Sequence, residues 1–446
     1  MTRTVLGVMM GLVACVTGAC NTVHGLREDI REVRERPSGQ ADDQAGVIAF
    51  KGEPDMRVRV AAGVDVRKIS GPDRLVVRPV AGGKAAPVTV RGPVTVSSSD
   101  KGVAVAHPEG RAVFPFGEDV EIAPATTDGQ ASAVSLQVES TRYPGFVTIR
   151  PRWSVNPVSF DVVVSMPVET YLPGVLTHEL WSTWPRQTFE AQAIAARTYA
   201  LHERGRSRTE GRAYDVEDST NDQVYGGSTT AIVPLEATRA TRGLVITNKG
   251  RLLRAYYSST CGGRPSSAGA VWRTDAGYEF NLAEPLQGQS RQAYCQASKH
   301  YRWEVTRTDD DVNRRLRSWG KANSHVVRDL TRLRRVEVEK TNAAGRPDRY
   351  ALIDEGGRTY SLSAEELRNA FNASANGVGP LTMENTVKSG DLEVEVWANQ
   401  VKVRGRGWGH GVGMCQWCAK GMADAGLDWA TMLRAFYPGA EVVKAY

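Results

Sequence analysis

The chain has 446 residues, a length that can bury a sizeable core and that suggests two or three domains. With 41% hydrophobic and 24% charged residues, its composition is ordinary for a globular protein and argues against wholesale disorder. The formal net charge of +6 is spread over a long chain, so it indicates a mild bias toward anionic partners and not a nucleic-acid-binding protein.

The first twenty residues have the features of an export signal. Arg3 supplies a positive charge, and the apolar run from Val5 to Val13 is too short to span a bilayer. Small residues precede a cysteine twice, which predicts a lipoprotein signal with lipidation of Cys15 or Cys20; a buried N-terminal helix is the alternative. We therefore expect an exported protein, either a membrane-anchored lipoprotein or a periplasmic or cell-envelope protein. A lipid anchor would be its only attachment to the membrane.

The pattern of residue types changes twice along the rest of the chain. Residues 21–45 are polar and charged and are expected to form a tether behind the signal peptide, residues 1–20. Residues 46–164 carry short alternating apolar runs separated by Gly, Pro and Asp, which predict β-strands. Residues 165–446 then mix helical and strand patterns and are expected to form a second domain. The expected fold is α+β: a β-rich N-terminal part, a helical core, and mixed C-terminal strands and helices.

Two helices are predicted for the core. Ser165 can cap the first and Pro167 suits its first turn, while Pro173-Gly174 should kink or break it. The second begins near Trp184-Pro185, and its many alanines predict burial on more than one side. Further predictions are strands at 243–247 and 252–258 and helices at 302–317, 364–371, 412–424 and 428–436.

Four cysteines follow the expected signal, at positions 261, 295, 415 and 418. In an oxidising compartment an even set favours disulfides, and Cys261–Cys295 with Cys415–Cys418 is the preferred pairing. A four-thiolate zinc site is the competing interpretation, because Cys415 and Cys418 have ligand-like spacing. Since the chain has a single Cys-x-x-Cys, neither a metal nor another cofactor is expected.

Residues 405–413 form a glycine-rich loop, in which five glycines alternate with Arg406, Trp408, His410 and Val412. Glycine at this density permits positive φ and a close approach of the backbone to a ligand. No Gly-Lys-Ser/Thr follows, so the loop does not bind phosphate in the manner of a P-loop. His410 is a candidate to bind substrate or to orient a catalytic group.

Six motifs follow one another along the chain. They are Tyr171-Leu172-x-Gly174-Val175-x-x-x-Glu179-Leu180, Trp184-Pro185 with Glu190–Leu201, Asp222–Gly227, Tyr257–Gly263 with Val271-Trp272, Gly405–Met414 with Gln416-Trp417, and Phe436–Gly439. Together they resemble the stage II sporulation protein D family, also called the SpoIID/LytB domain, over about residues 55–446. The resemblance implies a peptidoglycan lytic transglycosylase. The family's sporulation member cleaves glycan strands stripped of their stem peptides, and a relative enhances a cell-wall amidase.

The expected function is therefore cleavage of MurNAc-GlcNAc strands, stripped of stem peptides, to 1,6-anhydromuramic ends. One carboxyl group can act as acid and then as base, because the 6-hydroxyl of the muramic sugar itself attacks. A non-catalytic glycan-binding protein or amidase enhancer is the alternative. Peptidoglycan glycan strands are the expected partner, a cell-wall amidase is a second candidate partner, and nucleic acid is not expected.

Glu179 matches the family's catalytic glutamate. It follows an apolar pair at a predicted helix end, and an apolar surround would raise the pKa of its carboxyl group, as a general acid requires. The alternative is a surface glutamate paired with Arg197 or Arg186. Glu190 is the runner-up, although a dipole-favoured, ion-paired glutamate is the preferred interpretation of that residue.

Candidate substrate-binding residues lie in the same motifs. Arg197 is the candidate for the lactyl carboxylate of stripped glycan, because a guanidinium can bind a carboxylate through two parallel hydrogen bonds; a buried arginine that holds loop carbonyls is the alternative. Gln223 and Tyr225 are candidates for an acetamido group or a sugar ring, with turn and core roles as the alternative. The other candidates are Gln192, Tyr199, Ser259, Arg406, His410 and Gln416, with Trp408 and Trp417 as sugar platforms or core residues.

The resemblance does not bring a metal site with it. Some members of the family bind zinc through a histidine and two cysteines near the Gln-x-Tyr motif, where this chain has Glu217 and Asp222. Conversely, Cys415 and Cys418 fall where the family usually has Ser and Gly. With His410 they would form a different site, but a disulfide or two buried thiols is the expected state.

Overall fold

The structure is a computed structural model that describes residues 50–80, 83–99, 101–115, 117–125, 135–152 and 159–446. The expected signal peptide, both candidate lipidation sites (Cys15 and Cys20) and the tether lie outside the described residues. The chain divides into two compact units. The described residues from 50 to 256 together with 422–446 form the first, called the β-rich unit, and residues 257–421 form the second, called the central unit.

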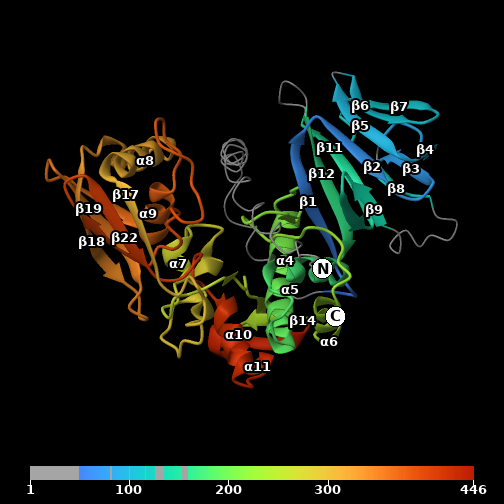
Figure 1. Ribbon diagram of the computed structural model, residues 1–446. Coiled ribbons are helices and arrows are strands. Elements are labelled where there is room, and N and C mark those ends of the chain that lie inside the picture. The colour runs from blue at the N-terminus through green and yellow to red at the C-terminus, as the bar shows by residue number, and fades with distance from the viewer. Residues whose placement is uncertain (1–49, 81–82, 100, 116, 126–134, 153–158) are drawn as a thin grey trace, which may run out of the picture. The chain divides into compact units, whose positions relative to one another are not determined.

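The β-rich unit contains two large sheets (Figure 1). The seven-stranded sheet has the order β13-β1-β12-β11-β8-β3-β4, and the six-stranded sheet the order β10-β9-β2-β5-β6-β7. Neighbouring strands are antiparallel, apart from the parallel pair β1 and β13. The bounds are β1 Asp55–Val64, β2 Val66–Ser70, β3 Arg74–Pro79, β4 Val88–Arg91, β5 Val94–Ser99, β6 Gly102–His107, β7 Gly110–Pro115, β8 Val120–Pro124, β9 Ser135–Val138, β10 Thr141–Pro144, β11 Phe146–Arg152, β12 Ser159–Pro167 and β13 Val216–Glu217. The strands predicted from alternating apolar runs are thereby confirmed.

Helices follow the last long strand of this unit. Strand β12 leads directly into α4 (Val168–Glu179), and α5 (Arg186–Thr209) and α6 (Ile232–Ala240) come next. All residues of α5 from Thr188 to Glu203 are buried, which confirms the burial predicted from its alanines. A three-stranded sheet, β15-β14-β24, and helix α11 complete the unit. Their bounds are β14 Leu244–Asn248, β15 Arg251–Leu252, β24 Glu441–Lys444 and α11 Trp429–Phe436.

Two predictions for the start of the helical core were wrong. Pro173 does not break the first helix, because residues 171–176 are all buried and their packing outweighs the hydrogen bond that proline cannot make. Ser165 is not a cap; it pairs with residues of β1 and β11 inside strand β12, and Pro167 is the N-cap residue. Residue 164, where a domain boundary was expected, lies within β12, and the chain passes from one unit to the other at residues 256–257 and 421–422.

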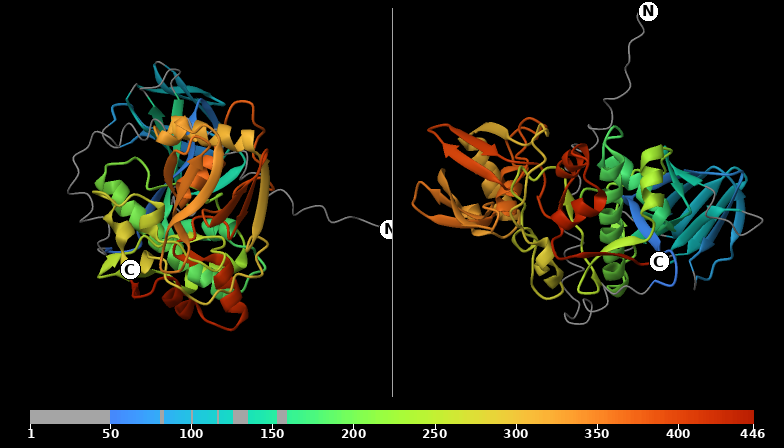
Figure 2. Two further views of the ribbon diagram at one scale, coloured as in Figure 1. Left: turned by 90° about the vertical axis from the view of Figure 1, so that its left-hand side faces the viewer. Right: turned by 90° about the horizontal axis from the view of Figure 1, so that it is seen from below.

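The central unit is built from three small sheets (Figure 2). Their orders are β16-β23, which is parallel, β17-β22-β21 and β18-β19-β20. Helices α8 and α9 pack with the two three-stranded sheets around one hydrophobic core. The bounds are β16 Tyr257–Ser258, α7 Ala268–Val271, β17 Trp303–Thr308, α8 Asp309–Ala322, β18 Leu333–Thr341, β19 Pro347–Asp354, β20 Thr359–Ser363, α9 Ala364–Phe371, β21 Leu392–Val396, β22 Gln400–Gly405, β23 Met414–Cys415 and α10 Gln416–Asp424, with short 3-10 helices at 279–282, 284–286 and 326–329.

The predicted helix at 302–317 begins later than expected. Residues 303–308 form β17, in which buried and exposed side chains alternate with the period of a strand. The hydroxyl of Thr308 then accepts a hydrogen bond from the N–H of Asp311 and caps α8. The predicted strand at 252–258 is also wrong, because it consists of the separate short strands β15 and β16. The helices predicted at 364–371 and 428–436 are confirmed to within one residue.

The chain is α+β, as expected from its sequence. None of the described helices is both long enough and apolar enough to cross a lipid bilayer.

Candidate functional site

Glu179 is the last residue of α4 and is half-buried. The two residues that follow it differ in burial: Leu180 is buried, whereas the side chain of Trp181 is 53% exposed. His178 is exposed, and its Nδ1 lies 2.8 Å from the carbonyl oxygen of Gly174. The carboxyl group therefore lies at a helix end, next in sequence to an imidazole and two residues from an exposed aromatic ring.

Glycines allow a loop to pack against α4 close to Glu179. At position 174, a Cβ would lie 2.3 Å from the carbonyl oxygen of Gly227 and 2.5 Å from the ring of Tyr225. At Gly226, which has a φ of +62°, a Cβ would lie 2.2 Å from the imidazole of His178. Gly174 and Gly226 are thus explained by close contact between the helix and this loop, whereas a Cβ at Gly227 would lie 2.5 Å from the carbonyl oxygen of Arg142 in β10.

The loop itself is held by Asp218. Its carboxylate accepts hydrogen bonds from the backbone N–H groups of Tyr225, at 2.7 Å, and Gly226, at 3.4 Å. Burial raises the pKa of Asp218, while these two hydrogen bonds act in the opposite direction. The conformation of the loop residues that pack against α4 is therefore fixed by local hydrogen bonds within the β-rich unit.

Gln223 and Tyr225 are core residues, in place of the expected contacts with sugar. Both are completely buried. The side chain of Gln223 accepts from the hydroxyl of Tyr171 at 3.1 Å and donates to the carbonyl of Ala196 at 3.2 Å. The ring of Tyr225 lies 4.9 Å from that of Tyr171, and its hydroxyl lies 3.0 Å from the sulfur of Met166. The turn and core roles considered for both residues are the ones that the structure supports.

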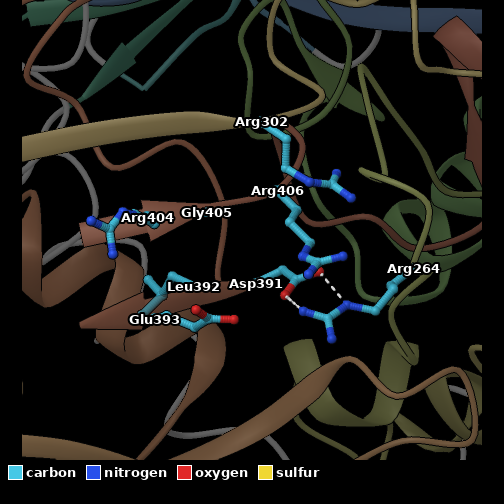
Figure 3. A pocket seen from close by; sticks show the side chains of 8 residues that line it. All are labelled: Arg264, Arg302, Asp391, Leu392, Glu393, Arg404, Gly405 and Arg406. Atoms are coloured by element: carbon cyan, nitrogen blue, oxygen red, sulfur yellow. Dashed lines mark hydrogen bonds and ion pairs between the residues drawn. The ribbon is translucent and has the colours of Figure 1, made fainter. Parts of the chain in front are cut away.

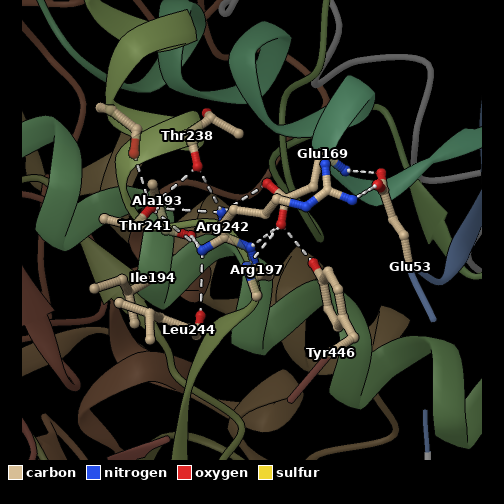
Figure 4. Close-up of polar contacts among 12 residues, drawn as sticks. Glu53, Glu169, Ala193, Ile194, Arg197, Thr238, Thr241, Arg242, Leu244 and Tyr446 are labelled. Carbon is tan, nitrogen blue, oxygen red and sulfur yellow. Dashed lines mark hydrogen bonds and ion pairs between the residues drawn. The ribbon is translucent and has the colours of Figure 1, made fainter. Parts of the chain in front are cut away.

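Arg197 is completely buried, and its guanidinium is bound within the β-rich unit (Figure 4). Nε donates to Oε1 of Glu169 at 3.0 Å, and Nη2 donates to Oε2 at 2.8 Å. The carbonyl oxygens of Leu244 and Thr238 accept further hydrogen bonds, at 3.2 and 3.3 Å. A carboxylate of the protein occupies the fork of this guanidinium, so Arg197 has a structural role in place of the expected contact with a lactyl carboxylate.

Glu169 joins three parts of the unit. Besides Arg197, its carboxylate accepts from the N–H of Gly243 at 2.9 Å and from the hydroxyl of Tyr446 at 2.6 Å. Burial alone would raise the pKa of Glu169, but the charge and hydrogen bonds of Arg197 outweigh burial and hold it below its usual value. The pair therefore connects α4 to α5, and the hydrogen bond from Tyr446 connects the last residue of the sequence to the same carboxylate.

Gln192 and Tyr199 also lie inside the unit and not on a binding surface. Gln192 is completely buried, and Tyr199 is buried with its hydroxyl 3.0 Å from a carboxylate oxygen of Asp222. Arg254 donates to the same hydroxyl at 3.3 Å. Burial, together with the negative charge of Glu203, raises the pKa of Asp222 to about 6. Helix α5 thus contributes a buried polar network, where substrate contacts were expected.

The ion pairs of α5 also bear on the alternative interpretation of Glu179. Arg186 pairs with Glu190 at 2.8 Å and with Glu236 at 3.4 Å, and Arg197 pairs with Glu169. Both arginines therefore have other glutamates as ion-pair partners. Glu190 is the ion-paired glutamate that its position indicated, with Arg186 as its partner.

His410 holds the glycine-rich loop of the central unit. Its Nδ1 accepts from the N–H of Val412 at 3.0 Å, and the ring is also hydrogen-bonded to the backbone of Tyr257. Burial and then the positive charge of Arg368 lower the pKa of His410 to about 3, so the imidazole is neutral at pH 7. Its ring packs edge-on against Trp272 at a centroid distance of 4.9 Å. These contacts hold the glycine-rich loop, and contact of the half-buried His410 with substrate stays a prediction.

The glycines of the loop serve a close approach of two backbone segments. Gly407 and Gly409 have φ values of +81° and +93°, and Gly411 and Gly413 are also in the left-handed region. A Cβ at Gly407 would lie 2.2 Å from the carbonyl oxygen of Thr260. Between these glycines, Trp408 exchanges two backbone hydrogen bonds with Thr260, at 2.8 and 3.1 Å. The glycine density predicted contact with a ligand, whereas here it permits contact with the 257–263 motif.

Arg406 differs from the other expected binding residues because it lines a hollow (Figure 3). Arg264 in this hollow is bound to Asp391 through two hydrogen bonds, and Arg404 is paired with Glu304 and Glu395. In the part of the chain that the structure describes, the guanidinium of Arg406 has no such partner. The volume is about 180 Å³, and the lining residues are Arg264, Arg302, Asp391, Leu392, Glu393, Arg404, Gly405 and Arg406.

The four cysteines form one cluster in the central unit, called the cysteine cluster. Each is at most 1% exposed, and their sulfur atoms all lie within 4.8 Å of one another. The sulfur of Cys261 lies 3.9 Å from that of Cys295 and 3.8 Å from that of Cys418. A disulfide bond is about 2.05 Å long, so these are thiols in a single group and not the two separate pairs that were expected.

The remaining candidates lie beside this cluster or away from it. Ser259 is half-buried, and Gln416 is buried. Glu217 and Asp222, at the positions where some family members bind zinc, are used within the protein: Asp222 accepts from the N–H of Glu217 at 2.9 Å, and Glu217 pairs with Arg59. Among the described residues, the cysteine cluster is the only group of three or more His, Cys, Asp and Glu side chains close enough to hold a metal ion.

Trp181 was not among the expected binding residues. A sequence does not indicate whether an isolated tryptophan is buried or exposed, because aromatic residues occur in both settings. Its position two residues after the motif glutamate was the available signal.

Two segments of the chain match known families. Residues 157–248 match the family described as Stage II sporulation protein, and residues 275–413 match a domain of unknown function, DUF8618. The first segment includes Glu179. The second lies within the central unit and contains Cys295 but none of the other three cysteines of the cluster.

Similar proteins carry related names. The chain is 24% identical over 364 residues to stage II sporulation protein D of Bacillus subtilis, covering 75% of this chain and 90% of the relative. It is 26% identical over 302 residues to the amidase enhancer of Bacillus subtilis, covering 61% of this chain but only 40% of that relative. It is also 28% identical over 285 residues to an uncharacterized protein of Brachyspira hyodysenteriae, covering 63% and 68% of the two chains.

Proposed function

Because the chain belongs to the stage II sporulation protein D family and has a role connected with the cell wall, we propose that it is an exported peptidoglycan lytic transglycosylase. Its substrate is the glycan strand of alternating GlcNAc and MurNAc, stripped of stem peptides. Its product ends in 1,6-anhydromuramic acid, and Glu179 is the general acid and base.

The position of Glu179 carries this proposal. The residue is half-buried at the C-terminal end of α4, where the helix dipole disfavours a negative charge and so favours a protonated carboxyl group. Such a carboxyl group is suited to donating a proton.

The reaction needs one carboxyl group. Glu179 gives its proton to the glycosidic oxygen of the leaving GlcNAc, and the bond between this oxygen and C1 of MurNAc breaks. The 6-hydroxyl oxygen of the same MurNAc forms a new bond to C1. Its proton passes to the Glu179 carboxylate, which restores the acid for the next cycle without consuming water.

One further side chain of the β-rich unit is assigned to substrate binding, and the central unit, taken by itself, offers a second and separate candidate for binding glycan. The exposed ring of Trp181 offers an apolar face on which a sugar ring can stack, two residues from Glu179 in sequence. Arg406 offers a guanidinium to the lactyl carboxylate that each stripped muramic sugar carries. Three other arginines line the same hollow with only two acidic residues, which favours an anionic ligand there.

The test is a product assay on stripped and intact peptidoglycan, with wild type and Glu179→Gln. We expect anhydromuramic ends, identified by mass spectrometry, from the wild type on stripped strands and none from the variant. The variant should unfold with the wild-type midpoint, so that its loss of activity reflects chemistry.

The relative named amidase enhancer supplies the second candidate function. A folded wild-type chain that binds glycan, yields no anhydromuramic product and accelerates a cell-wall amidase would replace the proposed enzyme with an enhancer. Adding an amidase to the same assay distinguishes the two, because amidase action releases stem peptides and leaves the glycan bonds intact.

A further inference from the structure

We propose that Cys261, Cys295, Cys415 and Cys418 form a structural zinc site, in which four thiolates hold one Zn²⁺ ion. The site does not depend on the proposed function, and it revises the expectation that the chain binds no metal. Its ligands also differ from the positions near the Gln-x-Tyr motif, which hold Glu217 and Asp222 in this chain.

The spacing of the sulfur atoms fits a tetrahedral ion. Zinc–sulfur bonds of about 2.3 Å place the four sulfurs of a regular tetrahedron about 3.8 Å apart. Cys261 lies 3.9 Å from Cys295 and 3.8 Å from Cys418, measured between sulfurs, and no pair in the cluster exceeds 4.8 Å. This is the size of a site for one ion, since an iron–sulfur cluster distributes its thiolates over several iron atoms.

The same distances do not favour two disulfides. A chain arranged for disulfides brings its sulfurs together in separate close pairs. Here Cys261 is nearly equidistant from Cys295 and Cys418, which come from different parts of the chain, so no preferred pair is formed. Four thiols this close either hold a metal ion or are readily oxidised to disulfides, and the geometry matches the metal.

Groups around the cluster stabilise negative charge on sulfur. The backbone N–H groups of Cys261 and Cys418 point to the sulfur of Cys415, at 3.2 and 3.4 Å. Four thiolates around Zn²⁺ carry a net negative charge, and these two N–H donors offset part of it.

Burial and connectivity make the site structural. All four ligands come from the protein and are buried, so no coordination position is left for substrate. Cys261 follows β16, Cys415 ends β23, and these two strands pair in parallel. Cys295 comes from a third segment, 34 residues after Cys261. The ion would thus connect Cys415, which follows the glycine-rich loop, to Cys261 and Cys295 in two other segments of the central unit.

The decisive experiment measures metal in the full-length chain purified without chelators. We expect about one zinc ion per chain by elemental analysis, and X-ray absorption should give four sulfur ligands at about 2.3 Å. The variants Cys295→Ser and Cys418→Ser should each lose most of the zinc. The double variant Cys15→Ser/Cys20→Ser is the matched control and should keep the zinc, because the site is assigned to the other four cysteines of the sequence.

Measurements on the wild type keep the proposal testable even where a cysteine variant fails to fold. Cobalt(II) added to chain stripped of metal should give the thiolate charge-transfer absorption and intense visible bands of a tetrahedral four-sulfur site. Mass spectrometry of the unreduced chain should show no disulfide among the four cysteines. A mass lower by two hydrogens per bridge, four freely reactive thiols with no metal, or iron in place of zinc would each overturn the assignment.

Discussion

Arg197 and Glu169 form a buried bidentate pair, in which Nε and Nη2 of the arginine donate to the two carboxylate oxygens at 3.0 and 2.8 Å. One partner comes from α5 and the other from α4, the helix that ends in Glu179. The pair therefore fixes the helix that presents the proposed catalytic carboxyl group, although neither member is placed to touch substrate.

Removing one partner of this pair should destabilise the protein strongly. Glu169→Gln leaves the buried guanidinium of Arg197 without a counter-charge, so we expect the free energy of unfolding to fall by about 3–5 kcal/mol. Asp73→Asn is the control, since its exposed pair with Arg91 should contribute about 1 kcal/mol or less. Denaturant unfolding measures both. Equal losses in the two variants would contradict the structural role assigned to Arg197.

A methyl group at position 174 should disturb the loop that packs on α4. Gly174→Ala places a Cβ 2.3 Å from the carbonyl oxygen of Gly227, so the helix and loop must move apart. Overpacking of this kind costs about 1–3 kcal/mol of stability, and glycan cleavage should fall with it. Gly52→Ala, which meets no atom within 4 Å, is the control and should change neither quantity. Wild-type stability of Gly174→Ala would show that the contact is not tight.

His410 should make stability depend on pH. Its pKa is about 3 in the folded chain and about 6.5 when unfolded, because burial and the charges of Arg368 and Arg346 oppose its protonation. The unfolded chain therefore binds the proton more readily. The stability contribution is complete above about pH 6.5 and is lost as the pH falls toward 3.

The variant His410→Asn isolates this effect. Its side-chain oxygen can still accept from the N–H of Val412, but it does not titrate. Denaturant unfolding at pH 5 and pH 8 should therefore show a smaller pH difference for His410→Asn than for the wild type. An unchanged difference would mean that other groups carry the acid sensitivity.

Trp181 should matter for glycan binding and not for folding. Because its side chain is 53% exposed, Trp181→Ala should leave the free energy of unfolding within about 0.5 kcal/mol of wild type. Loss of a stacking platform should weaken binding to glycan strands by about tenfold, measured by calorimetry or pull-down with stripped peptidoglycan. Trp397→Ala, at 47% exposure, is the control and should bind normally. Equal binding by both variants would remove Trp181 from the site.

Arg406 should distinguish stripped from intact glycan. Arg406→Gln removes a guanidinium that has no partner in the described part of the chain, so the fold should be little affected. Affinity for stripped strands, which carry free lactyl carboxylates, should fall about tenfold, while affinity for strands that keep their peptides should not change. Arg434→Gln, at an exposed arginine that does not line this hollow, is the control. A uniform loss on both substrates would indicate general charge attraction.

Much of the local structure followed from the sequence. Alternating apolar residues predicted the strands of the β-rich unit, and the alanines of α5 predicted its burial, because each pattern directly reflects which face of an element is covered. The motifs predicted a resemblance to the Stage II sporulation protein family, whose model matches residues 157–248. The prediction that Pro173 breaks its helix was wrong, because a rule based on local sequence does not include the packing of the surrounding residues.

Only the tertiary structure decided what the polar residues do. Arg197, Gln223 and His410 each belong to a motif, but a motif does not show whether a side chain faces solvent or a partner that lies far away in sequence. The four cysteines are the clearest case. Their spacing in sequence allowed three pairings or a metal, and the fold brings all four sulfurs within 4.8 Å because β16 and β23 pair side by side. Distances between segments 34 and 157 residues apart arise from folding, and no local pattern encodes them.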